Sequence, residues 1–277
     1  MKLKLKIFLI LFAGIAIAYT ACKKSSTPPP SDSMLTPDVV AGQLATTLNQ
    51  SLFGGLGAFD VSSGLSAPST IGMHNSSLSG GLKLTSGFSQ PLNAKMTGSF
   101  ASNVTCGLAI DTTVSVTDSS NGTTATITGS MKFNYVCSNS QVSGFTTNDK
   151  LTIVLASPSL NLSYKVGEIV TLTSSNPADP NANISLSGSL NSDGSYQYNT
   201  GTKKSGTSTF DYTLTSLVIS PVLGDIVSGN ATFNTSGTGP KGVWNYQGTI
   251  VFSGNHSATV TISGKAYHVN LQTGVVN

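Results

Sequence analysis

From residue 82 to the C-terminus, apolar and polar side chains alternate with a period of two along most of the chain. Successive side chains of a β-strand point to opposite faces of a sheet, so this period predicts strands with one buried and one solvated face. Strands with two such faces are typical of antiparallel rather than parallel sheets. The alternation therefore restricts the chain to a fold that is mainly antiparallel β-sheet.

Short clusters of Gly, Asn, Asp, Pro and Ser divide the alternating region into hairpins. We predict turns at 119–122, 176–183, 193–194, 254–255 and 264–265, with further strands on either side of Pro158. No helix recurs between the strands, which indicates one antiparallel domain of roughly ten to thirteen strands. A strongly curved or barrel-like sheet is favoured because long hairpins join sequential neighbours, while a two-sheet sandwich remains an alternative.

The first predicted hairpin carries two of the three cysteines, Cys106 and Cys137. The alternation places both on the predicted buried face, near the open end of the hairpin. Pairing Thr117 with Thr124 puts Cys106 opposite Tyr135, and a shift of two residues or a bulge would bring the cysteines face to face. We predict a Cys106–Cys137 disulfide that closes a loop of about 30 residues and contributes roughly 3 kcal/mol to stability.

One segment, residues 36–52, shows a helical period instead. Val40, Leu44 and Leu48 recur every four residues and form one apolar stripe. Thr36 is a suitable N-cap residue for this helix. The helix has no basic face of the kind that binds membrane surfaces, so we expect its stripe to pack on the sheet.

The chain opens with Lys2, Lys4 and Lys6 and continues with an apolar run over 7–18. A run of about 12 residues is too short to cross a hydrocarbon core of roughly 30 Å as a helix. A positive start, a short apolar stretch and small residues after it indicate a secretory signal that is cleaved off. We therefore predict a signal peptide over residues 1–21.

The end of this signal, Tyr19-Thr20-Ala21-Cys22, resembles the lipobox of bacterial lipoproteins of the Bacteroidota type. The resemblance implies cleavage before Cys22 and transfer of a diacylglyceryl group to the Cys22 sulfur. Residues 22–35 are polar and Pro-rich, like the tether that follows the lipidated cysteine in such proteins. The alternative is cleavage after Ala18, which would release the protein without lipid.

Lipid on Cys22 would leave Cys106 and Cys137 free to pair in an oxidising compartment. A single acyl chain binds a membrane only marginally, whereas the two chains of a diacylglyceryl group anchor a protein stably. We therefore expect a protein of the cell envelope, attached to the outer membrane through this lipid, with its periplasmic or surface orientation left open. The remainder, 36–277, is expected to form a single β-rich domain.

Charge and composition exclude one large class of partners. The chain has 14 Lys and no Arg, and removal of the three Lys of the signal leaves 11 Lys against 11 acidic residues. Nucleic-acid binding needs clustered Lys and Arg that neutralise phosphates, so no nucleic-acid partner is expected. Charged residues make up only 9% of the chain, and 38% of its residues are hydrophobic, which is too many for a disordered chain.

Few residues suit catalysis. Glu168 is the only Glu, and we expect it to pair with a Lys on a solvated face rather than to serve as one of the two carboxylates of a glycosidase. A cysteine nucleophile is not expected because Cys106 and Cys137 are predicted to be bonded. The sequence therefore identifies no catalytic residue, and no enzyme activity is expected.

Metal-binding candidates are weak as well. The predicted register of the final hairpin places His256 near Leu271 and His268 near Thr259, too far apart along the strand to share a metal. Residues 179–183 resemble the start of a calcium loop but lack its later Gly and Glu, so we interpret them as a turn. No metal and no cofactor are predicted.

These observations favour a non-catalytic binding or scaffold domain with a protein or glycan partner. One alternative is a carrier, in which the curved sheet and the helix over 36–52 enclose a lipid-like or other apolar ligand. A second alternative is an enzyme of unrecognised type, which would require Glu168 or a His beside an Asp in a cleft.

Overall fold

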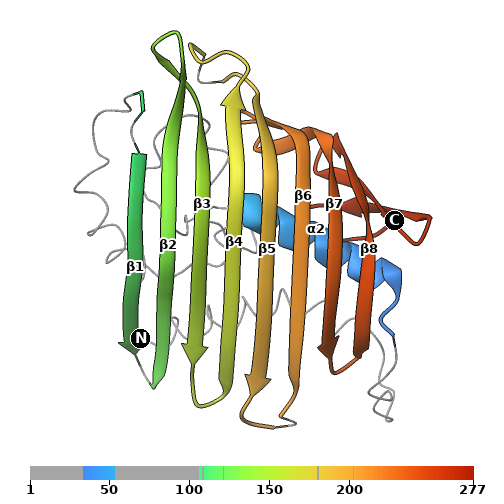
Figure 1. The fold of residues 1–277 in the computed structure, drawn as a ribbon. Helices are drawn as coiled ribbons and strands as arrows, with labels where there is room; N and C mark the ends of the chain where they lie inside the picture. Colours follow the sequence, from blue (N-terminus) through green and yellow to red (C-terminus); the bar gives the residue numbers. More distant parts are fainter. Residues whose placement is uncertain (1–33, 54–105, 108, 121, 180, 202) are drawn as a thin grey trace.

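The computed structural model describes residues 34–53, 106–107, 109–120, 122–179, 181–201 and 203–277. The described strands form one ten-stranded antiparallel sheet, whose order in space follows the order in the sequence from β1 to β10 (Figure 1). The predicted fold class, an antiparallel sheet with one N-terminal helix, is confirmed. A two-sheet sandwich is excluded for the described strands, because they all belong to a single sheet.

The elements follow one another without crossovers. They are α2 (Pro37–Phe53), β1 (Ala109–Ser120), β2 (Thr123–Ser138), β3 (Gln141–Ala156), β4 (Leu160–Ser174), β5 (Ile184–Tyr198), β6 (Ser205–Ser220), β7 (Asp225–Gly239), β8 (Gly242–Gly254), β9 (Ser257–Ile262) and β10 (Lys265–Asn270). The strands β1 to β8 are 12 to 16 residues long, whereas β9 and β10 have 6 residues each. The long strands reflect the long uninterrupted alternation in the sequence.

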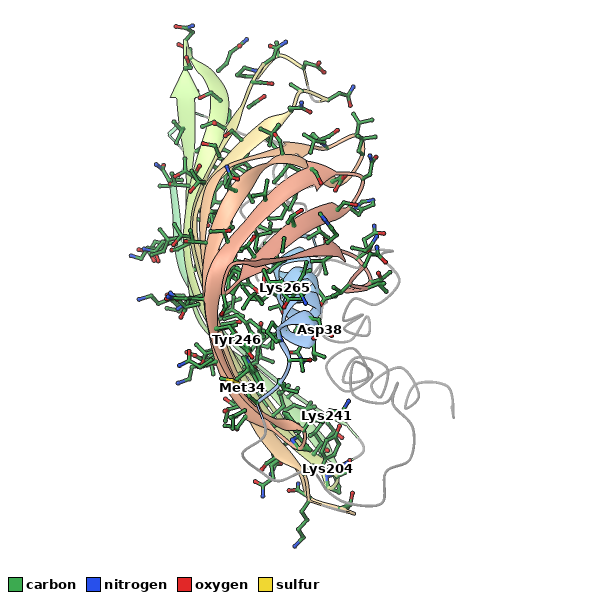
Figure 2. All side chains as sticks on the ribbon, turned by 90° about the vertical axis from the view of Figure 1, so that its right-hand side faces the viewer. Met34, Asp38, Lys204, Lys241, Tyr246 and Lys265 are labelled. Atoms are coloured by element: carbon green, nitrogen blue, oxygen red, sulfur yellow. A yellow bond between two sulfur atoms is a disulfide. The ribbon has the colours of Figure 1, made fainter. Side chains whose placement is uncertain are left out.

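The sheet is strongly curved, and α2 lies on its concave side (Figure 2). Register shifts interrupt the pairing at Val136/Cys137, Leu186/Gly188 and Thr215/Val218. Irregularities of this kind bend strands and increase their twist, which helps a long sheet to curve. The strand order leaves β1 and β10 as the two ends of the described sheet.

Helix α2 begins and ends one residue later than the predicted 36–52. Val40, Leu44 and Leu48 are fully buried, which confirms that the apolar stripe packs on the sheet. The hydroxyl of Tyr212 in β6 donates a hydrogen bond to the main-chain carbonyl oxygen of Leu44 at 3.0 Å. This bond joins the middle of the sheet to the helix and identifies the face that carries Tyr212 as the concave face.

The predicted register of the last hairpin is confirmed. His268 of β10 pairs with Thr259 of β9, and the main-chain N–H of Leu271 donates to the carbonyl oxygen of His256 at 2.7 Å. A short turn fixes hairpin register, so the pairing could be read from the turn alone.

The first hairpin is displaced by two residues from the predicted pairing, because Ser119 rather than Thr117 lies opposite Thr124. This shift brings Cys106 and Cys137 together, and their disulfide is present with a Cα–Cα distance of 5.5 Å. Cys106 is exposed and Cys137 is half-buried, so the prediction that both lie on the buried face is wrong. The register between β2 and β3 shifts immediately before Cys137, which ends the regular alternation there.

The predicted turn at Asp193-Gly194 is also wrong, because β5 continues straight through it. Gly194 faces the ring of Tyr164, and a Cβ at Gly194 would lie 3.3 Å from the Tyr164 Cδ2 atom. Glycine within a strand often allows such close approach of a neighbouring group. Gly194 therefore provides room for an aromatic ring rather than a turn.

The same arrangement occurs on β7, where the ring of Trp244 lies against Gly237 and a Cβ there would overlap it. The Trp244 Nε1–H donates to the Thr235 hydroxyl at 3.0 Å in a buried hydrogen bond, which holds the ring in place.

We expect Gly237→Ala to lower the free energy of unfolding by about 1–3 kcal/mol in urea denaturation, because overpacking displaces the ring. The matched substitution Ser236→Ala, on the exposed neighbour, should change it by less than about 0.5 kcal/mol. A Gly237→Ala protein as stable as the wild type would contradict this packing.

Candidate functional site

Two acidic side chains face each other on the concave side of the sheet. Asp149 of β3 and Glu168 of β4 are directly opposite in register, and their exposed fractions are 4% and 3%. The row continues through Leu190 of β5 to Tyr212 of β6, which bonds to α2, so all four side chains share the concave face. Side chains opposed in this way have Cβ atoms about 4.5–5.5 Å apart.

The expectation that Glu168 lies on a solvated face is wrong, because its side chain is buried. Along β4, Val166 and Val170 are buried on the same face as Glu168, whereas Lys165 is exposed on the other face. The alternation in the sequence already groups Glu168 with Val166 and Val170, so its burial could have been predicted from the sequence. Its position opposite Asp149 depends on the register between β3 and β4, which the sequence did not reveal.

The environment of Asp149 disfavours its charged form. Burial raises the pKa of Asp149 to about 7, although its Oδ1 atom accepts the main-chain N–H of Lys132 at 3.0 Å and this bond acts in the opposite direction. The ammonium groups of the flanking strands offer little compensation, because Lys132, Lys150 and Lys165 are exposed on the convex face. Lys132 forms its ion pair with Asp111 instead, at 2.6 Å.

Two buried hydroxyl groups flank the carboxylate pair. Thr147 of β3 and Ser192 of β5 each occupy a position diagonal to Glu168 on the concave face. Their exposed fractions are 3% and 5%, and neither hydroxyl oxygen has a hydrogen-bond partner among the described residues. An unsatisfied buried hydroxyl costs about 1–3 kcal/mol, so a pair of them beside two carboxylates calls for a specific explanation.

Two tyrosines extend this polar region. Burial raises the pKa of Tyr164 to about 12, and the charge of the nearby Glu168 acts in the same direction. Burial alone raises the pKa of Tyr135 to about 12. Both hydroxyls are buried without a hydrogen-bond partner among the described residues, although that of Tyr164 lies near Ser192. The concave side of β2 to β5 thus carries several buried hydroxyl groups.

Apolar side chains surround these polar groups. Met131 lies directly opposite Asp149, and Leu190 lies directly opposite Glu168. Leu151 and Val166 form the next opposed pair along the same strands, and all four of these apolar side chains are buried. Polar groups set among aliphatic side chains suit an organic molecule that has a polar head and an apolar body.

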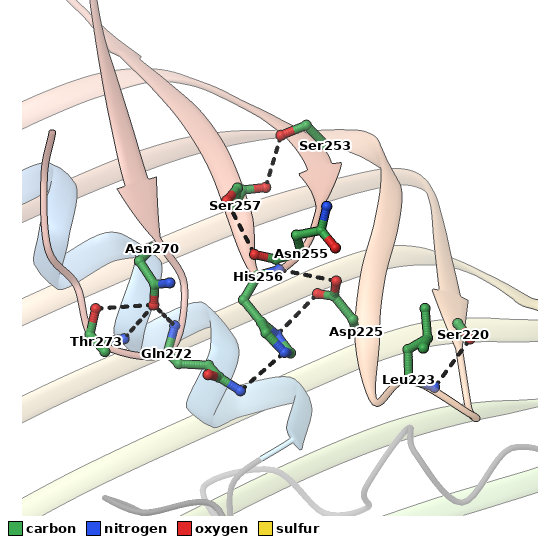
Figure 3. Close-up of polar contacts among 10 residues, drawn as sticks. All are labelled: Ser220, Leu223, Asp225, Ser253, Asn255, His256, Ser257, Asn270, Gln272 and Thr273. Carbon is green, nitrogen blue, oxygen red and sulfur yellow. Dashed lines mark hydrogen bonds and ion pairs between the residues drawn. The ribbon is translucent and has the colours of Figure 1, made fainter.

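A separate pair, formed by His256 and Asp225, lies at one end of the sheet (Figure 3). Asp225, at the start of β7, accepts the main-chain N–H of His256 at 3.0 Å, and its other carboxylate oxygen lies 3.2 Å from the His256 Nδ1 atom. The Nε2 atom of His256 lies 3.3 Å from the side-chain nitrogen of Gln272. Sequence reasoning missed Asp225, because the β8–β9 turn and the start of β7 meet only in the folded sheet.

The contacts of His256 indicate a structural role for this pair. Both ring nitrogens face partners, and the three residues join the start of β7, the β8–β9 turn and the segment after β10. General-base catalysis needs a ring nitrogen directed at a substrate or nucleophile. The pair is better explained as a structural contact that connects the segment after β10 to the start of β7.

The Asp149–Glu168 region, by contrast, contains groups that could bind a ligand or transfer a proton. Paired carboxylates can share a proton, act as acid and base, or bind a cation. Among the described residues, no group of three or more His, Cys, Asp or Glu side chains converges into a metal-binding cluster. Residues 179–183, considered above as a calcium loop, start with a turn in which Asp179 accepts the main-chain N–H of Asn181 at 2.9 Å.

The predicted lipidation site, Cys22, lies outside the described residues and stays a prediction. None of the helices in the described part of the chain is long and apolar enough to cross a membrane. The predicted disulfide residues are brought together at the open end of the first hairpin. No family model, curated protein or solved structure matches the chain.

Proposed function

We propose that this chain is a lipid-anchored protein of the cell envelope that binds a small organic ligand on the concave face of its sheet. The observation that carries the proposal is the buried Asp149–Glu168 pair, flanked by the buried hydroxyls of Thr147 and Ser192. Burying a carboxylate such as Asp149, whose charged form is disfavoured, and hydroxyls that have no hydrogen-bond partner among the described residues, destabilises a fold. Such groups persist at functional sites, where binding offsets the loss of stability.

The surroundings of the pair favour a binding role over a purely structural one. Small-molecule sites are typically apolar surfaces with a few placed polar groups, and this region has that composition. The buried carboxylates also change the carrier alternative, because a wholly apolar lipid would form no hydrogen bond or ion pair with Asp149 and Glu168. An amphipathic ligand fits both parts of the surface.

The ligand test uses protein extracted from its own membranes in mild detergent. We expect native mass spectrometry to detect a small molecule that is released on denaturation. Glu168→Gln should remove this extra mass, while the control Asp193→Asn, on an exposed side chain of β5, should retain it. An identical adduct in the Glu168→Gln protein would contradict binding at this site.

The membrane anchor is supported by the signal over 1–21, the lipobox-like segment before Cys22 and the polar tether. We expect the intact mass of the extracted protein to correspond to a chain that begins at Cys22 and carries acyl chains. Cys22→Ser should abolish the added lipid mass and release the protein from the membrane fraction. A soluble wild-type species that begins at Tyr19 would contradict the anchor.

A hydrolase is the second candidate function, and one observation favours it. An acid with a raised pKa beside a second carboxylate is the arrangement by which many hydrolases separate acid and base roles. Asp149, with a pKa of about 7, would be the acid and Glu168 the base or nucleophile. Release of nitrophenol from nitrophenyl glycosides, abolished by both Asp149→Asn and Glu168→Gln, would establish this activity in place of the non-catalytic role that we propose.

A further inference from the structure

We infer that the end of the sheet that carries the β5–β6 and β7–β8 turns lies against an anionic lipid surface, attracted to it by Lys203 and Lys204. The surface is that of the membrane to which lipid on Cys22 anchors the chain. This inference rests on the membrane anchor of the proposed function, and it adds an orientation and a class of lipid.

The two ends of the sheet differ in charge. Antiparallel strands in sequential order place the β1–β2, β3–β4, β5–β6 and β7–β8 turns together at one end, which we call the lysine end. By sequence, these turns contain Lys203, Lys204 and Lys241 and no acidic residue. The turns between β2 and β9 at the opposite end contain Asp179 and no lysine, and Asp225 directly follows one of them. The lysine end is therefore the positive end of the described sheet.

Two of these lysines are well placed to attract an anionic surface. Lys203 and Lys204 are exposed in the β5–β6 turn. The nearest acid on the flanking strands, Asp193, lies five residues before the last residue of β5, which is about 17 Å back along the strand. This exceeds the Debye length of about 8 Å at physiological salt, so Asp193 neutralises the two ammonium groups little. Lys241 is half-buried, and the attraction is assigned to Lys203 and Lys204 alone.

The tether joins the domain at the lysine end. Met34 forms a parallel bridge with Val243, and the main-chain N–H of Leu35 donates to the carbonyl oxygen of Val243 at 2.8 Å. Val243 is the second residue of β8, directly after the β7–β8 turn. Figure 2 shows Met34 toward the same end of the sheet as Lys204 and Lys241. The chain that leads to the membrane therefore leaves the domain beside the positive turns.

The length of the tether favours the same orientation. Met34 is 12 residues after Cys22, and 12 residues span at most about 40 Å when fully extended. The 15 residues of β5 extend about 50 Å from one end of the sheet to the other. A tether of this length holds the lysine end near the membrane more readily than the opposite end. Lys23 and Lys24 directly follow Cys22 and add positive charge to the tether.

An aromatic pair adjoins the two exposed lysines. The main-chain N–H of Tyr198 donates to the carbonyl oxygen of Lys204 at 2.8 Å, and the Tyr198 ring meets the Tyr196 ring edge to face with centroids 5.8 Å apart. Both tyrosines are half-buried. Tyrosine is enriched at the headgroup level of membranes, so tyrosines beside exposed lysines suit a surface that contacts lipid headgroups.

The experiment measures co-sedimentation of the full mature chain with vesicles at low ionic strength, in a Cys22→Ser form that carries no lipid. Vesicles of phosphatidylcholine are neutral, and vesicles that also contain phosphatidylglycerol are anionic. We expect binding to the anionic vesicles only, and its loss in high salt. Lys203→Gln combined with Lys204→Gln should weaken this binding about 25-fold, because each lysine at an anionic surface contributes roughly fivefold. The matched pair Lys150→Gln and Lys165→Gln, exposed on the convex face, should weaken it less than about twofold.

A second measurement uses the lipidated protein in both kinds of vesicle and follows acetylation of its lysines by mass spectrometry. Lys203 and Lys204 should react more slowly on anionic than on neutral vesicles, whereas Lys150 and Lys165 should react equally on both. Equal acetylation of Lys203 and Lys204 on both vesicles, or equal weakening by the two double variants, overturns the inference while the anchor stands. A wild-type protein that does not insert into neutral vesicles overturns the anchor instead.

Discussion

Asp149→Asn is expected to stabilise the protein at pH 8 by about 4 kcal/mol and to change its stability little at pH 4. The substitution keeps the size of the side chain and the oxygen that accepts the Lys132 N–H, but it removes the charge. A rise in pKa from 3.8 to about 7 in the folded protein corresponds to about this free energy. Few single substitutions stabilise a protein by so much.

The direction follows from proton binding. Between pH 4 and pH 7, Asp149 is protonated in the folded protein and ionised in the unfolded chain, so the folded state binds the additional proton. Stability therefore falls as pH rises through this window, and the loss is complete above the folded pKa of about 7. The amide introduced by Asp149→Asn does not titrate, so this part of the pH dependence should disappear in the variant.

Thermal midpoints of wild type and Asp149→Asn, measured at pH 4 and pH 8 without ligand, check this prediction. A domain of this size should gain roughly 2–4 °C per kcal/mol at pH 8. Asp193→Asn is the matched control on the exposed face of β5, and it should show no comparable pH-dependent gain. Equal effects of Asp149→Asn at both pH values would show that burial does not shift the pKa of Asp149 as described.

The second large effect concerns the disulfide. Replacing Cys106 and Cys137 together by Ser should lower the free energy of unfolding by roughly 3–4 kcal/mol, because the bond closes a loop with a sequence separation of 31 residues. The bond also fixes β1, which lies at one end of the described sheet, to β2. Its loss should therefore loosen this edge of the sheet before the strands that pack on α2.

Urea denaturation with and without a reductant measures the disulfide contribution. Reductant should destabilise the wild type by the same amount as the double substitution and should leave the double Ser variant unchanged. Hydrogen exchange should increase first in β1 and β2. A wild type whose stability does not respond to full reduction would contradict a stabilising role for the bond.

Patterns within one element predicted much of the fold. The helical stripe of Val40, Leu44 and Leu48 located α2 to within one residue at each end. The final hairpin was predicted in register because its tight turn fixes the pairing. These features depend on local spacing, which the sequence displays directly.

Several features that depend on contacts between strands were not predicted. Gly194 was interpreted as part of a turn because the ring of Tyr164 that lies against it comes from another strand. Glu168 was assigned to the solvated face because a lone acid normally avoids the interior, even though its alternation with Val166 and Val170 indicated burial. The sequence could not reveal that Asp149 lies opposite it, since the register of β3 and β4 is set by the whole sheet.

Glu168 is the only glutamate in the chain, so protein labelled with ¹³C at the glutamate carboxyl group gives one side-chain carboxyl signal from this site. The most direct test of ligand binding at the concave site compares this signal in protein freshly purified from its membranes and after dialysis at pH 4 and return to pH 8. Asp149, whose pKa is raised to about 7, is protonated at pH 4, and this should release the ligand, so we expect the signal to move and to return when the released small molecules are added back. A signal that is identical before dialysis, after dialysis and after addition of the released molecules would contradict a ligand at Asp149 and Glu168.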